Sequence, residues 1–171
     1  MKQKIDKSEP QTAPGVYVHE RAVIIGKVVL KENSSIWPNA VLRADIAPII
    51  IGEGSNVQDN ACIHVDFDKP AVLGRNVTVG HNAVVHGAKI GDNCLIGMGA
   101  TVMESVVGDN CLIAAGSVLP AGKVIESGSM VMGVPARAVR KLTPEEIAKI
   151  KENAEVYAKL AGVYQKDCRE I

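Results

Sequence analysis

The sequence predicts an all-β solenoid, a triangular parallel β-helix of hexapeptide repeats, followed by one α-helix. An aliphatic residue recurs about every six positions, and an aliphatic-Gly pair recurs with it, as in Ile51-Gly52 and Ile90-Gly91. The composition agrees, because the chain is 47% hydrophobic but only 3% aromatic. A core made of Val, Ile, Leu and Ala with few large rings is typical of a narrow interior that repeats along the chain.

The aliphatic positions fall into sets of three, and each set is spaced six and six. From the third residue of one set to the first residue of the next, the last two steps are five residues long. One coil therefore takes about 17 residues in three short sides. An amphipathic helix would need apolar residues at i, i+3, i+4 and i+7, which this spacing does not supply. Longer closing steps after Leu42 and Ile63 indicate loops inserted at one corner, around 46–48 and 66–70. We call these regularly spaced aliphatic residues the ladder; they are Leu30, Ile36, Leu42, Ile51, Val57, Ile63, Leu73, Val79, Val85, Ile90, Ile96, Val102, Val107, Ile113 and Leu119.

Three segments follow from this pattern: an N-terminal arm at 1–14, the solenoid at 15–140 and a C-terminal helix at 141–171. The ladder fades after Leu119, and 133–137 (GVPAR) resembles an exit loop. Thr143-Pro144-Glu145-Glu146 is a helix start, with Thr as N-cap and Glu three residues later. An apolar stripe then runs from Ile147 to Tyr164 and predicts packing on the solenoid or on a neighbouring subunit. We expect Gly162 to interrupt this helix.

Charge and cysteine content exclude several classes of function. The 19 Lys and Arg balance the 19 Asp and Glu, which argues against a nucleic-acid or anionic-membrane partner. The chain has no apolar run of membrane-spanning length and no secretory signal pattern. Its four cysteines lack CxxC spacing and are expected to be reduced thiols. We therefore predict a cytoplasmic protein.

Three of the four histidines have defined places on the coils. His64 and His86 each follow a ladder residue of the third side, so they should stack roughly 5 Å apart. Arg43 holds the same position one coil earlier. His81 lies on the second side instead, two residues after Val79 and above Asp59.

This placement predicts a metal site shared between subunits. The five residues from His81 to His86 cover roughly 16 Å if extended, whereas a zinc ion needs its nitrogen ligands at about 2.1 Å. His64 and His86 of one chain could meet His81 of another, and a cyclic homotrimer would form three such sites. Three neutral His with one open position are typical of a catalytic zinc. The alternative is that the stacked imidazoles are polar surface groups with ordinary hydrogen bonds.

Several motifs together resemble the gamma-class carbonic anhydrases, over roughly residues 15–165. They are 43–45 (RAD), 56–60 (NVQDN) with His64, and 81–87 (HNAVVHG). The resemblance implies a homotrimer of left-handed β-helices, with Zn²⁺ held at the subunit interfaces by His64, His81 and His86. Fe²⁺ and Co²⁺ are alternatives, because imidazole suits all three metals.

The resemblance also implies roles for residues around the metal. Gln58 would hydrogen-bond the metal-bound water or hydroxide, and Asp59 would orient a ligand His. Arg43 and Asp45 would form an ion pair near the interface, which either contacts bicarbonate or fixes the register of the subunits. Tyr164 is the candidate for a C-terminal-helix side chain near the metal, although packing of the helix explains it equally well.

The implied activity is that of a lyase, a carbonate dehydratase in which a metal-bound hydroxide reversibly hydrates CO2 to bicarbonate. The chain departs from archetypal members of the family in its acidic residues. Ile46 stands where those proteins carry a Glu, and the short insertion offers only Asp66 and Asp68 in place of an acidic loop. Alternative functions are a hexapeptide-repeat acyl-CoA transferase, a CoA-thioester hydrolase, and a trimeric metal-binding scaffold with weak or no catalysis.

Overall fold

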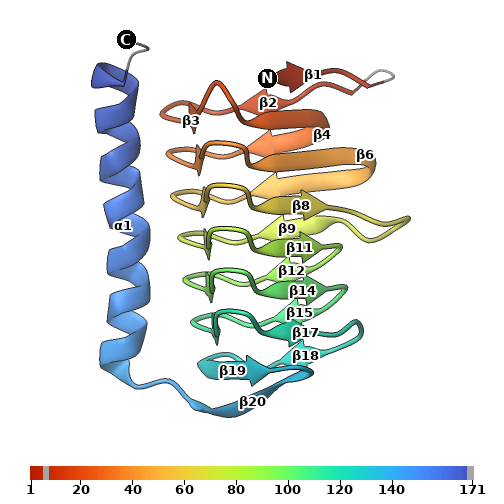
Figure 1. The fold of residues 1–171 in the computed structure, drawn as a ribbon, viewed down its shortest axis with the longest axis vertical. Coiled ribbons are helices and arrows are strands. Elements are labelled where there is room, and N and C mark those ends of the chain that lie inside the picture. Colours follow the sequence, from red (N-terminus) through yellow and green to blue (C-terminus); the bar gives the residue numbers. More distant parts are fainter. Residues whose placement is uncertain (6–7, 169–171) are drawn as a thin grey trace.

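The chain folds as a left-handed parallel β-helix with one C-terminal helix alongside it (Figure 1). This computed structural model describes residues 1–5 and 8–168. The predicted fold class is confirmed. Within the described residues, no helix has both the length and the apolar composition needed to cross a membrane.

The second side of the coils forms an eight-stranded sheet. Its strands are parallel except for the last pair, because β20 returns antiparallel to β19. The strands in chain order are β3 (Tyr17–Val18), β5 (Ser35–Ile36), β7 (Asn56–Val57), β10 (Thr78–Val79), β13 (Leu95–Ile96), β16 (Leu112–Ile113), β19 (Ser129–Gly133) and β20 (Ala136–Lys141).

The first and third sides form one continuous 12-stranded sheet, because β4 (Val23–Leu30) and β6 (Val41–Ile51) each run around the corner between them. The third side also contains β1 (Lys2–Gln3), β8 (Cys62–His64), β11 (Val84–His86), β14 (Thr101–Met103) and β17 (Val118–Leu119). The first side also contains β2 (Gln11–Thr12), β9 (Ala71–Leu73), β12 (Lys89–Ile90), β15 (Val106–Val107) and β18 (Val124–Ile125).

The predicted ladder is the core of the solenoid. Leu42 pairs with Ile63, and Ile63 pairs with Val85, so equivalent ladder residues stack on successive coils. Every ladder residue is buried and belongs to one hydrophobic cluster. Each coil is held to the next by backbone hydrogen bonds of parallel strands, and the ladder side chains fill the interior together with smaller buried residues such as Ala83 and Cys94.

Three details differ from the sequence prediction. Residues 46–48 do not form a loop but lie within β6, where a register shift absorbs the longer step. The solenoid continues past Leu119 through β18 and β19, within the predicted bounds of 15–140, but 133–136 form the turn of the β19–β20 hairpin instead of an exit loop. Residues of the predicted N-terminal arm add β1 and β2 to the sheet. Parallel pairing with a neighbouring coil stabilises these segments even where the aliphatic pattern weakens.

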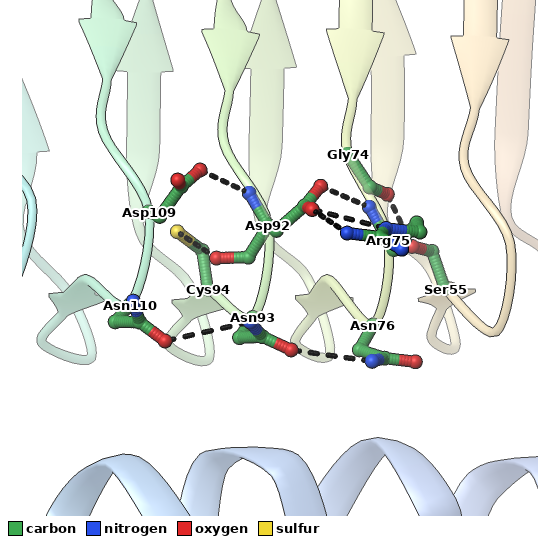
Figure 2. Close-up of polar contacts among 9 residues, drawn as sticks. All are labelled: Ser55, Gly74, Arg75, Asn76, Asp92, Asn93, Cys94, Asp109 and Asn110. Atoms are coloured by element: carbon green, nitrogen blue, oxygen red, sulfur yellow. Dashed lines mark hydrogen bonds and ion pairs between the residues drawn. The ribbon is translucent and has the colours of Figure 1, made fainter.

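The corner between the first and second sides is held by two columns of polar side chains (Figure 2). Asn76, Asn93 and Asn110 all have a positive φ near 53°, which Asn tolerates better than most residues. Their amides form a chain of hydrogen bonds at 3.2 and 3.4 Å. Beside them, the Asp92 carboxylate accepts hydrogen bonds from the backbone N–H and the guanidinium of Arg75. Coils are therefore linked at this corner by side chains as well as by backbone.

Helix α1 (Pro144–Asp167) lies along the second side. Its buried residues are Ile150, Ala154 and Ala161. Gly162 does not interrupt it, which corrects the sequence prediction; packing against the solenoid offsets the modest helix penalty of one glycine.

An aromatic cluster joins the C-terminal half of α1 to the N-terminal end of the solenoid. The Trp37 ring lies 5.4 Å from Tyr17, 5.3 Å from Tyr157 and 5.1 Å from Tyr164, measured between ring centroids. Aromatic pairs at such distances contribute beyond the apolar area they bury. Four of the five aromatic side chains therefore lie where the helix docks, the fifth (Phe67) is exposed elsewhere, and the solenoid interior contains none of them.

Replacing Thr143 by alanine should lower the stability of the folded chain by about 1 kcal/mol. The Thr143 side chain accepts a hydrogen bond from the Glu146 N–H, and the Glu146 carboxylate accepts one from the Thr143 N–H, so the substitution removes half of a capping box. Thermal unfolding followed by circular dichroism at fixed protein concentration should show a decrease of about 2–4 °C in Tm. Thr143→Ser is the matched control and should retain the cap; an equal loss in both variants would contradict this role.

Candidate metal centre

Two stacked imidazoles lie on the third side. His64 and His86 are register partners at the ends of β8 and β11, and their ring centroids are 5.2 Å apart. Arg43 pairs with His64 one coil earlier. The predicted column of Arg43, His64 and His86 is therefore present in the structure.

Asp45 links Arg43 to His64. Its carboxylate forms an ion pair with Arg43 and accepts a hydrogen bond from Nε2 of His64 at 3.1 Å. Burial raises the pKa of Asp45, but the hydrogen bonds from His64 and Arg43 outweigh it and hold the pKa below its usual value. The predicted Arg43–Asp45 pair thus exists within one chain and supports the His64 ring.

His81 lies in a separate group at the corner after β10. Its Nδ1 donates to the Asp59 carboxylate at 2.8 Å, which leaves the Nε2 lone pair facing the hydroxyl of Tyr157 at 3.3 Å. A buried amide positions the backbone, because Oε1 of Gln58 accepts from the His81 N–H at 3.2 Å. Gln58, Asp59 and His81 therefore form one unit, as their sequence motifs suggested.

The structure brings Tyr157, rather than Tyr164, to the histidine. Tyr164 packs on Tyr17 and Trp37 at the far end of α1, so its predicted place near a metal is not supported by any contact to His81. Burial raises the pKa of Tyr157, and the nearby Asp59 charge raises it further, so the phenol is a hydrogen-bond donor at neutral pH. Sequence reasoning missed Tyr157 because both tyrosines lie on the same apolar stripe.

These imidazoles fit a divalent metal as a donor set but not within a single chain. Among the described residues, one group of three His, Cys, Asp or Glu side chains has its ligand atoms within 4.8 Å of one another, and it does not contain His64 or His81. His81, with its ring oriented by a carboxylate and Nε2 unprotonated, has the arrangement typical of a metal-binding imidazole, although in this single chain Nε2 contacts the Tyr157 hydroxyl. The three-His site predicted from the sequence stays a prediction that requires a second chain.

The group that does meet this distance is Asp66, His86 and Glu104. Glu104 is engaged by an ion pair with Lys69, and Asp66 pairs with Lys69 through the backbone of the insertion. A metal there would have to compete with the Lys69 ammonium for the Glu104 carboxylate. The three-His set is therefore the better candidate, and the Asp66 and Glu104 carboxylates lie beside its His86.

Known proteins resemble this chain in sequence and in fold. The bacterial transferase hexapeptide model (six repeats) matches residues 70–104 and 87–121. A protein of Methanocaldococcus jannaschii named "Probable carbonic anhydrase" is 47% identical over 85% of this chain and 92% of its own length. The chain belongs to the gamma-class carbonic anhydrase family.

Other relatives in the family differ in length and name. The mitochondrial gamma carbonic anhydrase 2 of Arabidopsis thaliana is 41% identical over 93% of this chain, which spans 59% of that relative's length. Among solved structures, a hexapeptide transferase family protein of Anaplasma phagocytophilum has 36% identity and a TM-score of 0.92, covering 95% of this chain and 97% of its own. The names of relatives thus include both carbonic anhydrase and transferase.

Proposed function

We propose that this protein is a carbonic anhydrase-like lyase that reversibly hydrates CO2 to bicarbonate at metal sites shared between the subunits of a homotrimer. His64 and His86 of one subunit and His81 of the next would hold the metal. The observation that carries the proposal is the separation of the histidines into two units on different sides of the coil, each with its own carboxylate, Asp45 or Asp59. The family membership supports the substrate.

Zn²⁺ is the proposed metal, with Fe²⁺ or Co²⁺ as alternatives. When bound, such a metal acidifies a water molecule to a pKa near 7 and supplies the nucleophile for CO2. The protein's contribution is to hold three neutral imidazoles with one position left open. Asp59 contributes by fixing the proton of His81 on Nδ1, which keeps Nε2 available.

Gln58 and Tyr157 are placed to handle the oxygen atoms of the substrate. The Gln58 amide is 3% exposed and is held at both ends, by the His81 N–H and by Oδ1 of Asn56. One N–H of its amide group and a second oxygen lone pair remain for another partner. Tyr157 carries its proton and is adjacent to Nε2 of His81. We assign both as hydrogen-bonding groups that orient CO2 or bicarbonate.

Metal analysis of the purified protein beside stopped-flow CO2 hydration tests the proposal. The expected result is about one metal ion per chain in a trimer, and hydration activity that is lost on chelation and restored by Zn²⁺. Bound metal without hydration but with turnover of an acyl-CoA would instead favour a transferase or thioester hydrolase. Bound metal with neither activity would indicate the scaffold.

Replacing Asp59 by asparagine should weaken zinc binding by about 10–100-fold, because the amide cannot hold His81 as a carboxylate does. Competition against a zinc chelator measures the dissociation constant directly. The matched control is Asp68→Asn, because Asp68 is exposed in the insertion at φ 60°, a conformation that Asn also adopts. Equal affinities in both variants would show that Asp59 does not support a ligand.

A further inference from the structure

Phe67 is an aromatic side chain that is largely exposed to solvent. It is the single Phe of the chain, it is 73% exposed, and it lies at the tip of the turn that follows β8. The turn is well defined, since Asp66 and Lys69 exchange backbone hydrogen bonds and the Asp66 carboxylate accepts from the Phe67 N–H at 2.8 Å. Burial of such a ring would contribute about 1.5–3 kcal/mol of favourable free energy, which its exposure to water loses.

The turn leans along the solenoid toward later coils. Lys69 forms an ion pair with Glu104, which lies two coils beyond His64 in the chain, and Asp66 approaches both Glu104 and His86. Phe67 is therefore held near the level of His86, beside the histidine column of the third side.

An apolar hollow of 290 Å³ lies between α1 and the second side of the coils, away from the third side that carries Phe67. Its lining includes Leu95, Met98, Leu112 and Tyr157, together with Gln58. Met98 stacks one coil beyond His81 and is 60% exposed, although large apolar side chains gain by burial. Because Gln58 and Tyr157 both contact His81, the hollow opens directly beside that histidine.

The proposed shared site would bring the Phe67 turn and this hollow together. Nitrogen ligands of one zinc ion lie about 2.1 Å from it, so the three rings must be in contact across the interface. A cyclic trimer with its axis along the solenoid keeps equal coils level. Phe67 follows His64 by three residues, and Met98 lies about 4.8 Å beyond His81 along the axis. The side chain of Phe67 in one subunit and that of Met98 in its neighbour can then meet across the interface.

We propose that Phe67 of each subunit seats in the hollow formed by Leu95, Met98, Leu112 and Tyr157 of its neighbour and shields this side of the site from bulk water. The occupant is thus a second copy of this chain. The ring would complete an apolar wall suited to uncharged CO2, and exclusion of water would strengthen the hydrogen bonds of Gln58 and Tyr157. This inference rests on the proposed function, because it requires the shared metal site.

Cross-linking of the full-length zinc-loaded protein tests the contact. The double variant Phe67→Cys and Met98→Cys, treated with a short bismaleimide, should give covalent dimers and trimers on a denaturing gel. The matched control pairs Phe67→Cys with Val124→Cys, which replaces an exposed residue at the C-terminal end of the solenoid. The control and the wild-type chain, with its own four cysteines, should remain monomeric on the gel.

Reactivity provides a second measurement that needs no cross-link. Maleimide should modify Met98→Cys about tenfold faster when Phe67 is replaced by alanine in the same chain, because access controls thiol reactivity. Equal rates and no cross-link in a trimer with full zinc occupancy would overturn the Phe67 contact and leave the proposed function intact. Absence of both trimer and zinc in the wild-type protein would instead overturn the shared site itself, and this inference with it.

Discussion

Replacing His81 by alanine is expected to reduce bound metal to less than about a tenth of one ion per chain and to abolish CO2 hydration. The two remaining imidazoles, His64 and His86, lie stacked on one side of the coil and supply two of the three neutral nitrogens that a catalytic zinc requires. Asp59 then has no imidazole to orient. Metal content by mass spectrometry and stopped-flow hydration measure the two effects. His19→Ala is the matched control, because His19 accepts a local hydrogen bond from the Arg21 N–H and belongs to neither histidine unit.

Mixing of variants decides whether the site is shared. Chains carrying His81→Ala retain His64 and His86, and chains carrying His64→Ala with His86→Ala retain His81. Coexpression of the two inactive chains in equal amounts should restore about a quarter of the sites, since one in four interfaces then combines the intact halves. A site contained within one chain would give no recovery. Full metal occupancy of His81→Ala alone would refute the role of His81.

The largest expected loss of stability comes from Gly52→Ala. A Cβ atom at Gly52 would lie 2.0 Å from the carbonyl oxygen of Gly74 and 2.4 Å from its carbonyl carbon, both backbone atoms of the next coil. Neither can rotate away, so the two coils must separate and weaken their hydrogen bonds. A loss of about 4 kcal/mol or more in the free energy of unfolding is expected, measured by denaturant unfolding at fixed protein concentration.

Gly162→Ala is the matched control for the same chemical change. Position 162 lies inside α1, and a Cβ atom there meets nothing within 4 Å. Alanine favours the helix over glycine by about 1 kcal/mol, so this variant should gain stability. Equal and small effects in both variants would show that the coils are less closely packed at Gly52 than the structure indicates.

The sequence was sufficient to predict the interior of the solenoid and one half of the candidate site. Parallel coils hydrogen-bond residue for residue, so a regular spacing in the chain becomes a column in space. The pairing of Leu42 with Ile63 and of His64 with His86 followed from counting alone. The counting was wrong at 46–48, because a strand can absorb extra residues by a register shift as readily as a loop can.

The tertiary structure alone decided the surroundings of those columns. Tyr157 and Tyr164 lie on the same helical stripe, and the height at which α1 docks determines which of them meets His81. That height depends on packing against Trp37, more than a hundred residues earlier in the chain. The approach of Asp66 and Glu104 to His86 likewise depends on the orientation of the turn at 66–70. Local periodicity therefore determined the repeating fold and the histidine column, whereas long-range side-chain packing determined which groups complete the site.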